Sequence, residues 1–273
     1  MSAEGGSAGR DLDLVRLEVD GPVATITLND PATSNAQSYR MLDQIDLAFA
    51  AAGEEADVRV VVVRGAGGNF SSGHRLEAGF GQGEDPVELF REFKRHNVDL
   101  LLRWREFPKP TIALVEGYCI YAGWMLAAAM DLVFAEEGAQ FLGGYVQYNS
   151  IAWDLGPRRA KEMCFESRFL SARECAEAGF VSRVLAAEEV EKETYAYAHR
   201  VAENDPFTLQ ISKLQINKAQ DAQGFRIALE DSFGDYLGML FLPGFDPLAP
   251  DGRKRLRTVD LALRGRRGER FGL

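Results

Sequence analysis

Hydrophobic residues recur along this chain with two different periods, and these periods predict alternating strands and helices. Leu14–Asp20 and Val23–Leu28 alternate apolar and polar residues around the turn Asp20–Gly21–Pro22, which predicts a β-hairpin. Ser38–Ala52 repeats apolar residues at helical spacing, and Val58–Val63 is a β-branched run typical of a strand covered on both faces. This order of elements predicts an α/β fold with a largely parallel sheet.

The same patterns extend through the rest of the chain. Further strands are expected over Thr111–Val115, Leu132–Ala135, Gln140–Leu142 and Val181–Leu185. Helices are expected over Pro86–Arg105, Pro157–Glu166, Ala172–Ala178 and from Ala187 to about Leu240, with breaks near Pro206 and Gly224. Residues 1–12 lack the apolar core of a signal peptide, so we expect a disordered start.

The segment Lys109–Ala135 contains the pattern on which the prediction of a functional site depends. It reads as a buried strand, a turn with glycines at Gly117 and Gly123, a helix that is apolar on every side, and a second strand. If the turn Ile120–Gly123 lines a cleft, its backbone N–H groups are aimed at an anion or a developing oxyanion. The alternative is a core helix that caps itself.

Composition narrows the class of protein. Of the 273 residues, 46% are hydrophobic and 26% charged, which is ordinary for a soluble globular protein. The formal net charge of −10 argues against a general nucleic-acid binder. The three cysteines have no metal-ligand spacing, and no stretch approaches the roughly 20 apolar residues that span a bilayer. We therefore expect a cytoplasmic protein with reduced thiols, no metal and no membrane or nucleic-acid partner.

Several common catalytic motifs are absent from the sequence. There is no phosphate-binding loop, no dinucleotide fingerprint and no G-x-S-x-G elbow. The histidines His74, His96 and His199 are too scattered for a zinc site, and His96 and His199 are expected on helix surfaces. Two glycine-containing turns remain, at Phe70–His74 and Ile120–Gly123, from which two backbone donors could converge on one carbonyl oxygen.

Four ordered motifs resemble the successive signatures of the enoyl-CoA hydratase/isomerase (crotonase) superfamily. They are VATITLNDPATSNAQS, VRVVVVRGAGGNFSSGHRL, KPTIALVEGYCIYAGWMLAAAMDLVFAEEGAQF and LSARECAEAGFVSRVLAAEEV. The resemblance implies a crotonase-like spiral of β-β-α units over residues 13–200 and a C-terminal helical trimerisation region over 201–273. It also implies acyl-CoA thioester substrates, no other cofactor, and a homotrimer or hexamer.

The resemblance also suggests functional positions. The family's two oxyanion donors are backbone amides, which correspond by motif to His74 and Ala122 in this sequence. Gly123, Tyr121, Trp124 and Met125 then belong to the substrate-binding turn.

The sequence departs from the hydratase pattern at the acid–base positions. The family's first catalytic glutamate corresponds to Met125, and the region of the second is shortened to LGGYVQYNSIAWDLG. Syn hydration needs a general base and an acid, so loss of both carboxylates places that mechanism in doubt. Tyr121 and Trp124 add bulk where substrate should pass, and Arg75 replaces the usual aspartate. Arg75 is a candidate substrate contact or the partner of a nearby carboxylate.

Other side chains could take part in proton chemistry. Asp154 is the only carboxylate near the altered loop, and it either acts as a base or caps or anchors the helix that begins at Pro157. Tyr145 and Tyr148 can donate a proton or pack in the core, and Gln147 can orient water. Tyr236 either lines the pocket, as its helix does in some relatives, or forms a core or trimer contact.

We therefore expect a crotonase-fold enzyme that acts on an acyl-CoA or carrier-bound acyl thioester by enolate stabilisation. Its reaction is a specialised one of the lyase, decarboxylase, isomerase or hydrolase type. The alternatives are a thioester- or ligand-binding protein without catalysis, and a pathway-specific cyclase or lyase that uses no CoA. Candidate CoA contacts are the loop Pro31–Asn35, in which Ser34 replaces the family's basic residue, and the basic tail after Asp251.

Overall fold

Six strands form the main sheet in the computed structural model, which describes residues 12–75, 85–144, 146–240 and 258–266. In spatial order they are β1 (Val15–Asp20), β2 (Val23–Leu28), β3 (Val60–Gly65), β4 (Thr111–Val115), β6 (Leu132–Glu136) and β9 (Arg183–Leu185). β1 and β2 are antiparallel, and every other pair in this sheet is parallel. The predicted hairpin and the largely parallel sheet are therefore confirmed.

A second sheet of three strands lies beside the first. It is formed by β5 (Tyr118–Ile120), β7 (Gln140–Leu142) and β8 (Leu170–Ser171), in the order β5-β7-β8. The sequence pattern assigned Tyr118–Ile120 to a turn, and this assignment was wrong. The three residues pair with β7, and Cys119 forms an isolated bridge with Ser71.

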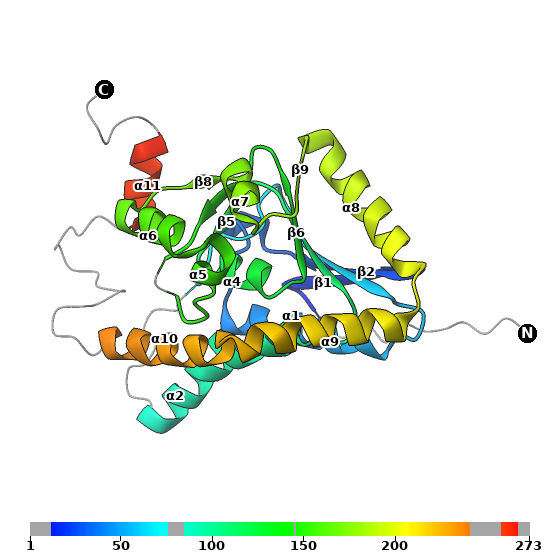
Figure 1. The fold of residues 1–273 in the computed structure, drawn as a ribbon, viewed down its shortest axis with the longest axis horizontal. Helices are drawn as coiled ribbons and strands as arrows, with labels where there is room; N and C mark the ends of the chain where they lie inside the picture. Colours follow the sequence, from blue (N-terminus) through cyan, green and yellow to red (C-terminus); the bar gives the residue numbers. More distant parts are fainter. Residues whose placement is uncertain (1–11, 76–84, 145, 241–257, 267–273) are drawn as a thin grey trace, which may run out of the picture.

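Helices cover both faces of the main sheet, as the β-branched run in β3 predicts. Val61 and Val63 belong to the main core cluster, which includes α1 (Tyr39–Glu54). Val60 and Val62 point to the opposite face and pack with α8 (Ala187–Ala202). Figure 1 shows α8 lying outside the sheet, while α9 (Pro206–Ala222) and α10 (Phe225–Leu240) run across another side of the molecule. This alternation of two buried faces accounts for the absence of polar residues in the run Val60–Val63.

The remaining helices connect these layers. They are η1 (Pro31–Thr33), α2 (Pro86–Lys94), the π-helix η2 (Arg95–Asp99), α3 (Leu100–Arg105), α4 (Ala122–Ala128), α5 (Ile151–Leu155), α6 (Pro157–Glu166), α7 (Ala172–Ala178), α9 (Pro206–Ala222), α10 (Phe225–Leu240) and α11 (Thr258–Arg266). The described part of the expected C-terminal region, 201–273, is helical. The expected disordered start, 1–12, falls almost wholly outside the described residues.

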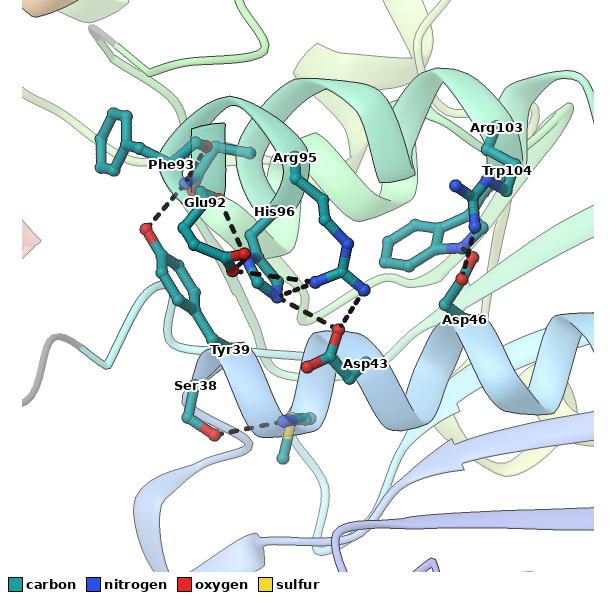
Figure 2. Close-up of polar contacts among 12 residues, drawn as sticks. Ser38, Tyr39, Asp43, Asp46, Glu92, Phe93, Arg95, His96, Arg103 and Trp104 are labelled. Atoms are coloured by element: carbon teal, nitrogen blue, oxygen red, sulfur yellow. Dashed lines mark hydrogen bonds and ion pairs between the residues drawn. The ribbon is translucent and has the colours of Figure 1, made fainter. Parts of the chain in front are cut away.

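The long helix expected over Pro86–Arg105 contains a π-helical turn, and this turn changes the position of His96. Figure 2 shows His96 facing α1, where its Nε2 lies 3.1 Å from Asp43 Oδ1 and its ring stacks on Tyr39 with centroids 4.1 Å apart. Only 2% of His96 is exposed, so the predicted surface position was wrong. A π-helix spaces its hydrogen bonds five residues apart, so α-helical spacing misplaces the side chains within it. His199, by contrast, is exposed as expected.

An ion pair attaches α9 to the end of the main sheet. Lys213 Nζ lies 2.8 Å from Asp131 Oδ2, and the Lys213 side chain is only 9% exposed. The same carboxylate oxygen accepts a hydrogen bond from Thr111 N at 2.8 Å. This contact ties the C-terminal helices to the start of β4.

Candidate active site

Two glycine-containing turns meet beside the small sheet, one at Gly73 and the other at Ile120–Ala122. A Cβ atom placed on Gly73 would lie 3.1 Å from Ile120 O and 3.7 Å from Ala122 N. The φ of Gly73 is +102°, in the region that favours glycine. Glycine at this position therefore permits both the turn and the close approach of the second turn.

The backbone amide of His74 is directed away from its neighbouring strand partner. Gln37 N donates to Gly73 O at 2.7 Å, and Arg75 N donates to Gln37 O at 2.9 Å. Because successive amides along an extended chain point to opposite sides, the intervening His74 N–H faces away from Gln37. Among the described residues, this amide has no hydrogen-bond acceptor.

The amide of Ala122 is also without an acceptor in the described part of the chain. It follows Tyr121, whose φ of 46° and ψ of −100° are unusual for a residue with a side chain. Tyr121 N donates to Leu142 O at 2.8 Å, and Tyr121 O accepts from Met125 N at 2.9 Å, which fixes the turn on both sides. Strained conformations of this kind persist only where surrounding contacts hold them. Two unpaired amides thus come from two adjoining turns.

The bulky residues of the second turn pack against other parts of the chain. Trp124 is fully buried and stacks on Phe180, with centroids 4.4 Å apart and planes 3° apart. Met125 is 1% exposed and belongs to the main core cluster, which leaves no titratable group at this helix position. The Tyr121 ring lies over Gly144, where an added Cβ would come within 2.8 Å of Tyr121 Cε1. Trp124 is therefore packed in the core, and its place beside the substrate path stays a prediction.

Gly123 has a packing function in this turn. A Cβ atom on Gly123 would lie 2.8 Å from Ser71 O and 3.1 Å from Ser71 Cβ. Ser71 is itself immobilised, because its Oγ donates to Asn35 O at 2.8 Å and accepts from Gly73 N at 3.2 Å. The absence of a side chain at Gly123 therefore lets α4 approach the turn that contains His74.

The His74 imidazole is half-buried beside Gln147. Burial lowers the pKa of His74 to about 4, and hydrogen bonding with Gln147 opposes this shift. The ring is neutral at physiological pH, and within the described residues its buried Nε2 has no partner. Gln147 is 3% exposed, so it lies with the imidazole below the surface. Tyr145, the other candidate in this loop, lies outside the described residues.

Tyr148 is buried at the contact between this loop and the C-terminal helices. Its ring meets Phe225 edge-to-face, with centroids 6.2 Å apart, and Phe225 also packs against the Arg105 guanidinium. Burial raises the pKa of the Tyr148 hydroxyl well above its usual value, Arg105 opposes the shift, and Asp154 and Asp221 add to it. Tyr148 is thus a protonated phenol at neutral pH, and among the described residues its oxygen has no hydrogen-bond partner.

Asp154 does not cap the helix that follows it, so that expectation was wrong. It lies within α5, and α6 begins after Gly156 without a side-chain cap. Asp154 Oδ2 instead accepts hydrogen bonds from Trp124 Nε1 and Ser150 Oγ, each at 2.7 Å. Burial raises the pKa of Asp154 to about 7, although both hydrogen bonds act to lower it. This carboxyl group therefore titrates near neutral pH.

Two other predicted contact residues have partners within the chain. Arg75 is exposed, and its Nη1 lies 3.7 Å from Asp30 Oδ2, so the predicted pairing with a carboxylate is confirmed. Tyr236 on α10 stacks with Phe93 of α2, with ring centroids 5.8 Å apart. This packing agrees with the core alternative stated for Tyr236.

Sequence reasoning missed the structural function of Asn35. Its side chain is fully buried, and its Nδ2 donates to Ala66 O at 2.9 Å and Asn69 O at 2.7 Å. The residue has a φ of 56°, which asparagine tolerates better than most residues. Asn35 thus joins the loop Pro31–Asn35 to the segment that precedes the first turn, and the contact of this loop with CoA stays a prediction. An asparagine at the end of a polar loop before a helix was the one available signal.

Two searches of the described residues were negative. Among them, no group of three or more histidine, cysteine, aspartate or glutamate side chains could hold a metal ion. No helix in the described part of the chain is both long and apolar enough to cross a membrane.

Comparisons with known proteins agree with this architecture. The sequence model described as "Enoyl-CoA hydratase/isomerase" matches residues 18–231. EchA13 of Mycobacterium tuberculosis, which carries an enoyl-CoA hydratase name, is 34% identical, with 82% of this chain and 80% of that protein covered.

Two solved structures are similar along most of their length. A probable enoyl-CoA hydratase from Mycobacterium smegmatis is 36% identical, with a TM-score of 0.78 and coverage of 82% of this chain and 94% of that chain. An enoyl-CoA hydratase/isomerase from Xanthobacter autotrophicus Py2 is 34% identical, with a TM-score of 0.76 and coverage of 82% and 86%. This chain therefore belongs to the enoyl-CoA hydratase/isomerase family and has the crotonase fold.

Proposed function

We propose that this protein is an enzyme that binds an acyl-CoA or carrier-bound acyl thioester and stabilises a negative charge on the thioester oxygen. The donors are the backbone amides of His74 and Ala122. The observation that carries this proposal is that two adjoining turns each present one amide without an acceptor among the described residues. An enolate or tetrahedral intermediate needs such preorganised donors, and removing one typically costs about 2.7–4 kcal/mol of barrier.

The reaction is proposed to be more specialised than hydration of a simple enoyl thioester. Hydration needs a base for water and an acid for the α-carbon. Met125 occupies the position at which the family resemblance places a glutamate, and it is packed in the core. The neutral His74 imidazole and the Gln147 amide are the polar side chains beside the first donor. Cleavage, decarboxylation, isomerisation or hydrolysis through an enolate or oxyanion fits this set of groups best.

A pair of variants at one position tests the oxyanion function directly. His74→Pro removes the amide hydrogen, which makes no bond to another described residue, whereas His74→Ala keeps it. We expect turnover to fall about 10²–10³-fold in His74→Pro and to change little in His74→Ala. Equal turnover in the two variants, with both folded by circular dichroism, would exclude the His74 amide as a donor. A large and equal loss in both variants would assign the chemistry to the imidazole instead, because neither variant carries it.

A substrate panel tests the specialised reaction. Crotonyl-CoA hydration near the diffusional ceiling of about 10⁸–10⁹ M⁻¹s⁻¹ in kcat/KM would contradict it. Formation of CoA, carbon dioxide or a shortened acyl-CoA from branched, β-keto or malonyl-type thioesters would support it. Calorimetry with CoA and acyl-CoA separates an enzyme from the second candidate, a non-catalytic thioester-binding protein. That candidate is favoured by the core position of Met125, and it predicts binding without turnover.

The proposed CoA contact and assembly can be tested separately. Arg264 and Arg266 of α11 are exposed, and Arg266 Nη1 donates to Tyr118 Oη at 2.8 Å. If this basic segment binds the CoA phosphates, the affinity should fall steeply with salt. We propose a homotrimer or hexamer, because α9 and α10 leave Phe207 (68%), Ile216 (69%) and Ile227 (66%) exposed. Sedimentation equilibrium at several protein concentrations measures the assembly.

A further inference from the structure

The first turn of α4 carries an indole ring that packs into the core. Trp124 follows Ala122 by two residues and is fully buried between two rings. It stacks on Phe180 and meets Phe141 edge-to-face at a centroid distance of 6.0 Å. Because Trp124 and Ala122 belong to the same short helix, a shift of the indole shifts the Ala122 amide with it.

The only polar atom of this ring is bound to a carboxylate from a distant part of the chain. Trp124 Nε1 donates to Asp154 Oδ2 at 2.7 Å, and Ser150 Oγ donates to the same oxygen at 2.7 Å. Two short hydrogen bonds to one ionised oxygen are charge-assisted and roughly twice as strong as neutral ones. Asp154 therefore fixes the orientation of the indole ring within the core.

The surroundings of Asp154 favour its neutral form. Asp154 acts electrostatically on the Tyr148 hydroxyl and on the Cys175 thiol of α7, and the pKa values of both groups are raised, mainly by burial, which keeps them uncharged. The interactions that stabilise the charged carboxylate are the two hydrogen bonds from Trp124 and Ser150. Protonation would weaken both, because a neutral oxygen is a poorer acceptor.

We propose that Asp154 is a positioning residue that acts through the Trp124 indole to hold the Ala122 amide in place, and that protonation of Asp154 loosens this hold. The inference rests on the proposed function, in which the Ala122 amide is an oxyanion donor. Burial places the pKa of Asp154 at about 7, so the change falls within the physiological range. Turnover should then rise with pH as the carboxylate forms.

The kinetic test compares the pH profile of the wild type with that of Asp154→Asn. Asparagine keeps an oxygen that accepts from Trp124 and Ser150, but it does not titrate. In the wild type we expect kcat to rise about tenfold between pH 6 and 8, with KM nearly unchanged. At low pH the hydrogen bonds from Trp124 and Ser150 to protonated Asp154 have about half their strength, so they hold the Ala122 amide less well. In Asp154→Asn this rise of kcat with pH, the rising limb of the profile, should be absent, and kcat should stay near the low-pH level of the wild type. Persistence of the limb in the variant would overturn the proposal.

A second measurement needs no substrate and uses the protein's three tryptophans. In a ¹⁵N-labelled sample, the Nε1–H resonance of Trp124, assigned with Trp124→Phe, should titrate near pH 7 in the wild type and stay constant in Asp154→Asn. Trp104 is the internal control, because its Nε1 donates to a different carboxylate, Asp46, at 3.1 Å.

The two measurements separate the possible failures. A Trp124 resonance that is constant from pH 5.5 to 8.5 would overturn the inference whatever the activity. Equal turnover in His74→Pro and His74→Ala, with a titrating Trp124 resonance, would instead refute the proposed function and leave the Asp154–Trp124 coupling established. If Asp154→Asn fails to fold, titration of the wild-type resonance still decides the question.

Discussion

Gly123→Ala is the substitution that tests most directly how closely the two turns must approach. The added Cβ would lie 2.8 Å from Ser71 O and 3.1 Å from Ser71 Cβ. Ser71 cannot yield, because it is fully buried and its backbone N donates to Tyr118 O while its O accepts from Ile120 N. The first turn of α4 must therefore move.

The expected effects can be worked from this contact. An ordinary contact begins near 3.4 Å, so the helix must retreat by about 0.6 Å. Overpacking of this kind costs about 1–3 kcal/mol, and the better helix propensity of alanine returns about 0.5–1 kcal/mol. We expect a net loss of up to about 2.5 kcal/mol in the free energy of unfolding. Because oxyanion donors work at about 2.7–3.1 Å, the same shift should lower turnover about 10²-fold.

Urea unfolding and thioester turnover measure the two effects, and Gly234→Ala in α10 is the matched control. No atom lies within 4 Å of a Cβ placed on Gly234, so alanine there should stabilise the helix by up to about 1 kcal/mol and leave turnover unchanged. A Gly123→Ala protein with wild-type stability and turnover would refute the reasoning, because it would show that the turns tolerate a wider separation.

Three further predictions concern buried polar groups. Asn35→Ala should destabilise the protein by about 2–4 kcal/mol in urea unfolding, because two loop carbonyls lose their donor and alanine is strained at positive φ; Asn35→Gly, free of that strain, should lose about 1 kcal/mol less. Lys213→Met should cost about 2 kcal/mol at pH 7 by removing the partner of Asp131, and a double variant with Asp131→Asn should recover part of it, whereas additive losses would show that the pair contributes nothing. For Asp154, the unfolded carboxyl group with its pKa of 3.8 ionises before the folded one with its pKa of about 7, so wild-type stability falls as pH rises from about 4 to about 7. At pH 8.5, the free energy of unfolding of Asp154→Asn should therefore exceed that of the wild type, by up to about 4 kcal/mol before solvent screening is allowed for. Thermal unfolding should show this difference at pH 8.5 and no difference at pH 4.

Some elements were predictable because their signals are local. The run of valines in β3 needs two apolar faces, and the structure supplies them through α1 and α8. The bounds Ala172–Ala178 were predicted as observed, and the helix begins with a capping box between Ser171 and Glu174 and ends at Gly179. Helix ends of this kind are encoded within a few residues.

Other features could not be predicted because they depend on contacts between distant segments. The π-helical turn buries His96 against α1, and the periodicity of Pro86–Arg105 does not predict this turn. The strand Tyr118–Ile120 pairs with β7, and the glycines at Gly117 and Gly123 around it had predicted a turn. The buried position of Trp124 followed from its apolar neighbours, but its hydrogen bond to Asp154 joins residues 30 positions apart.

The sequence by itself determined the family, the order of strands and helices, and the two glycine-containing turns, because these depend on local periodicity and on motifs in a fixed order. Only the tertiary structure decided that the amides of His74 and Ala122 lie in adjoining turns and that Trp124 stacks on Phe180. It alone showed that Asp154 binds the indole instead of capping a helix. The physical reason is that folding brings distant segments together and so decides which groups form hydrogen bonds and which become buried. The spacing of residues along the chain does not specify these long-range contacts.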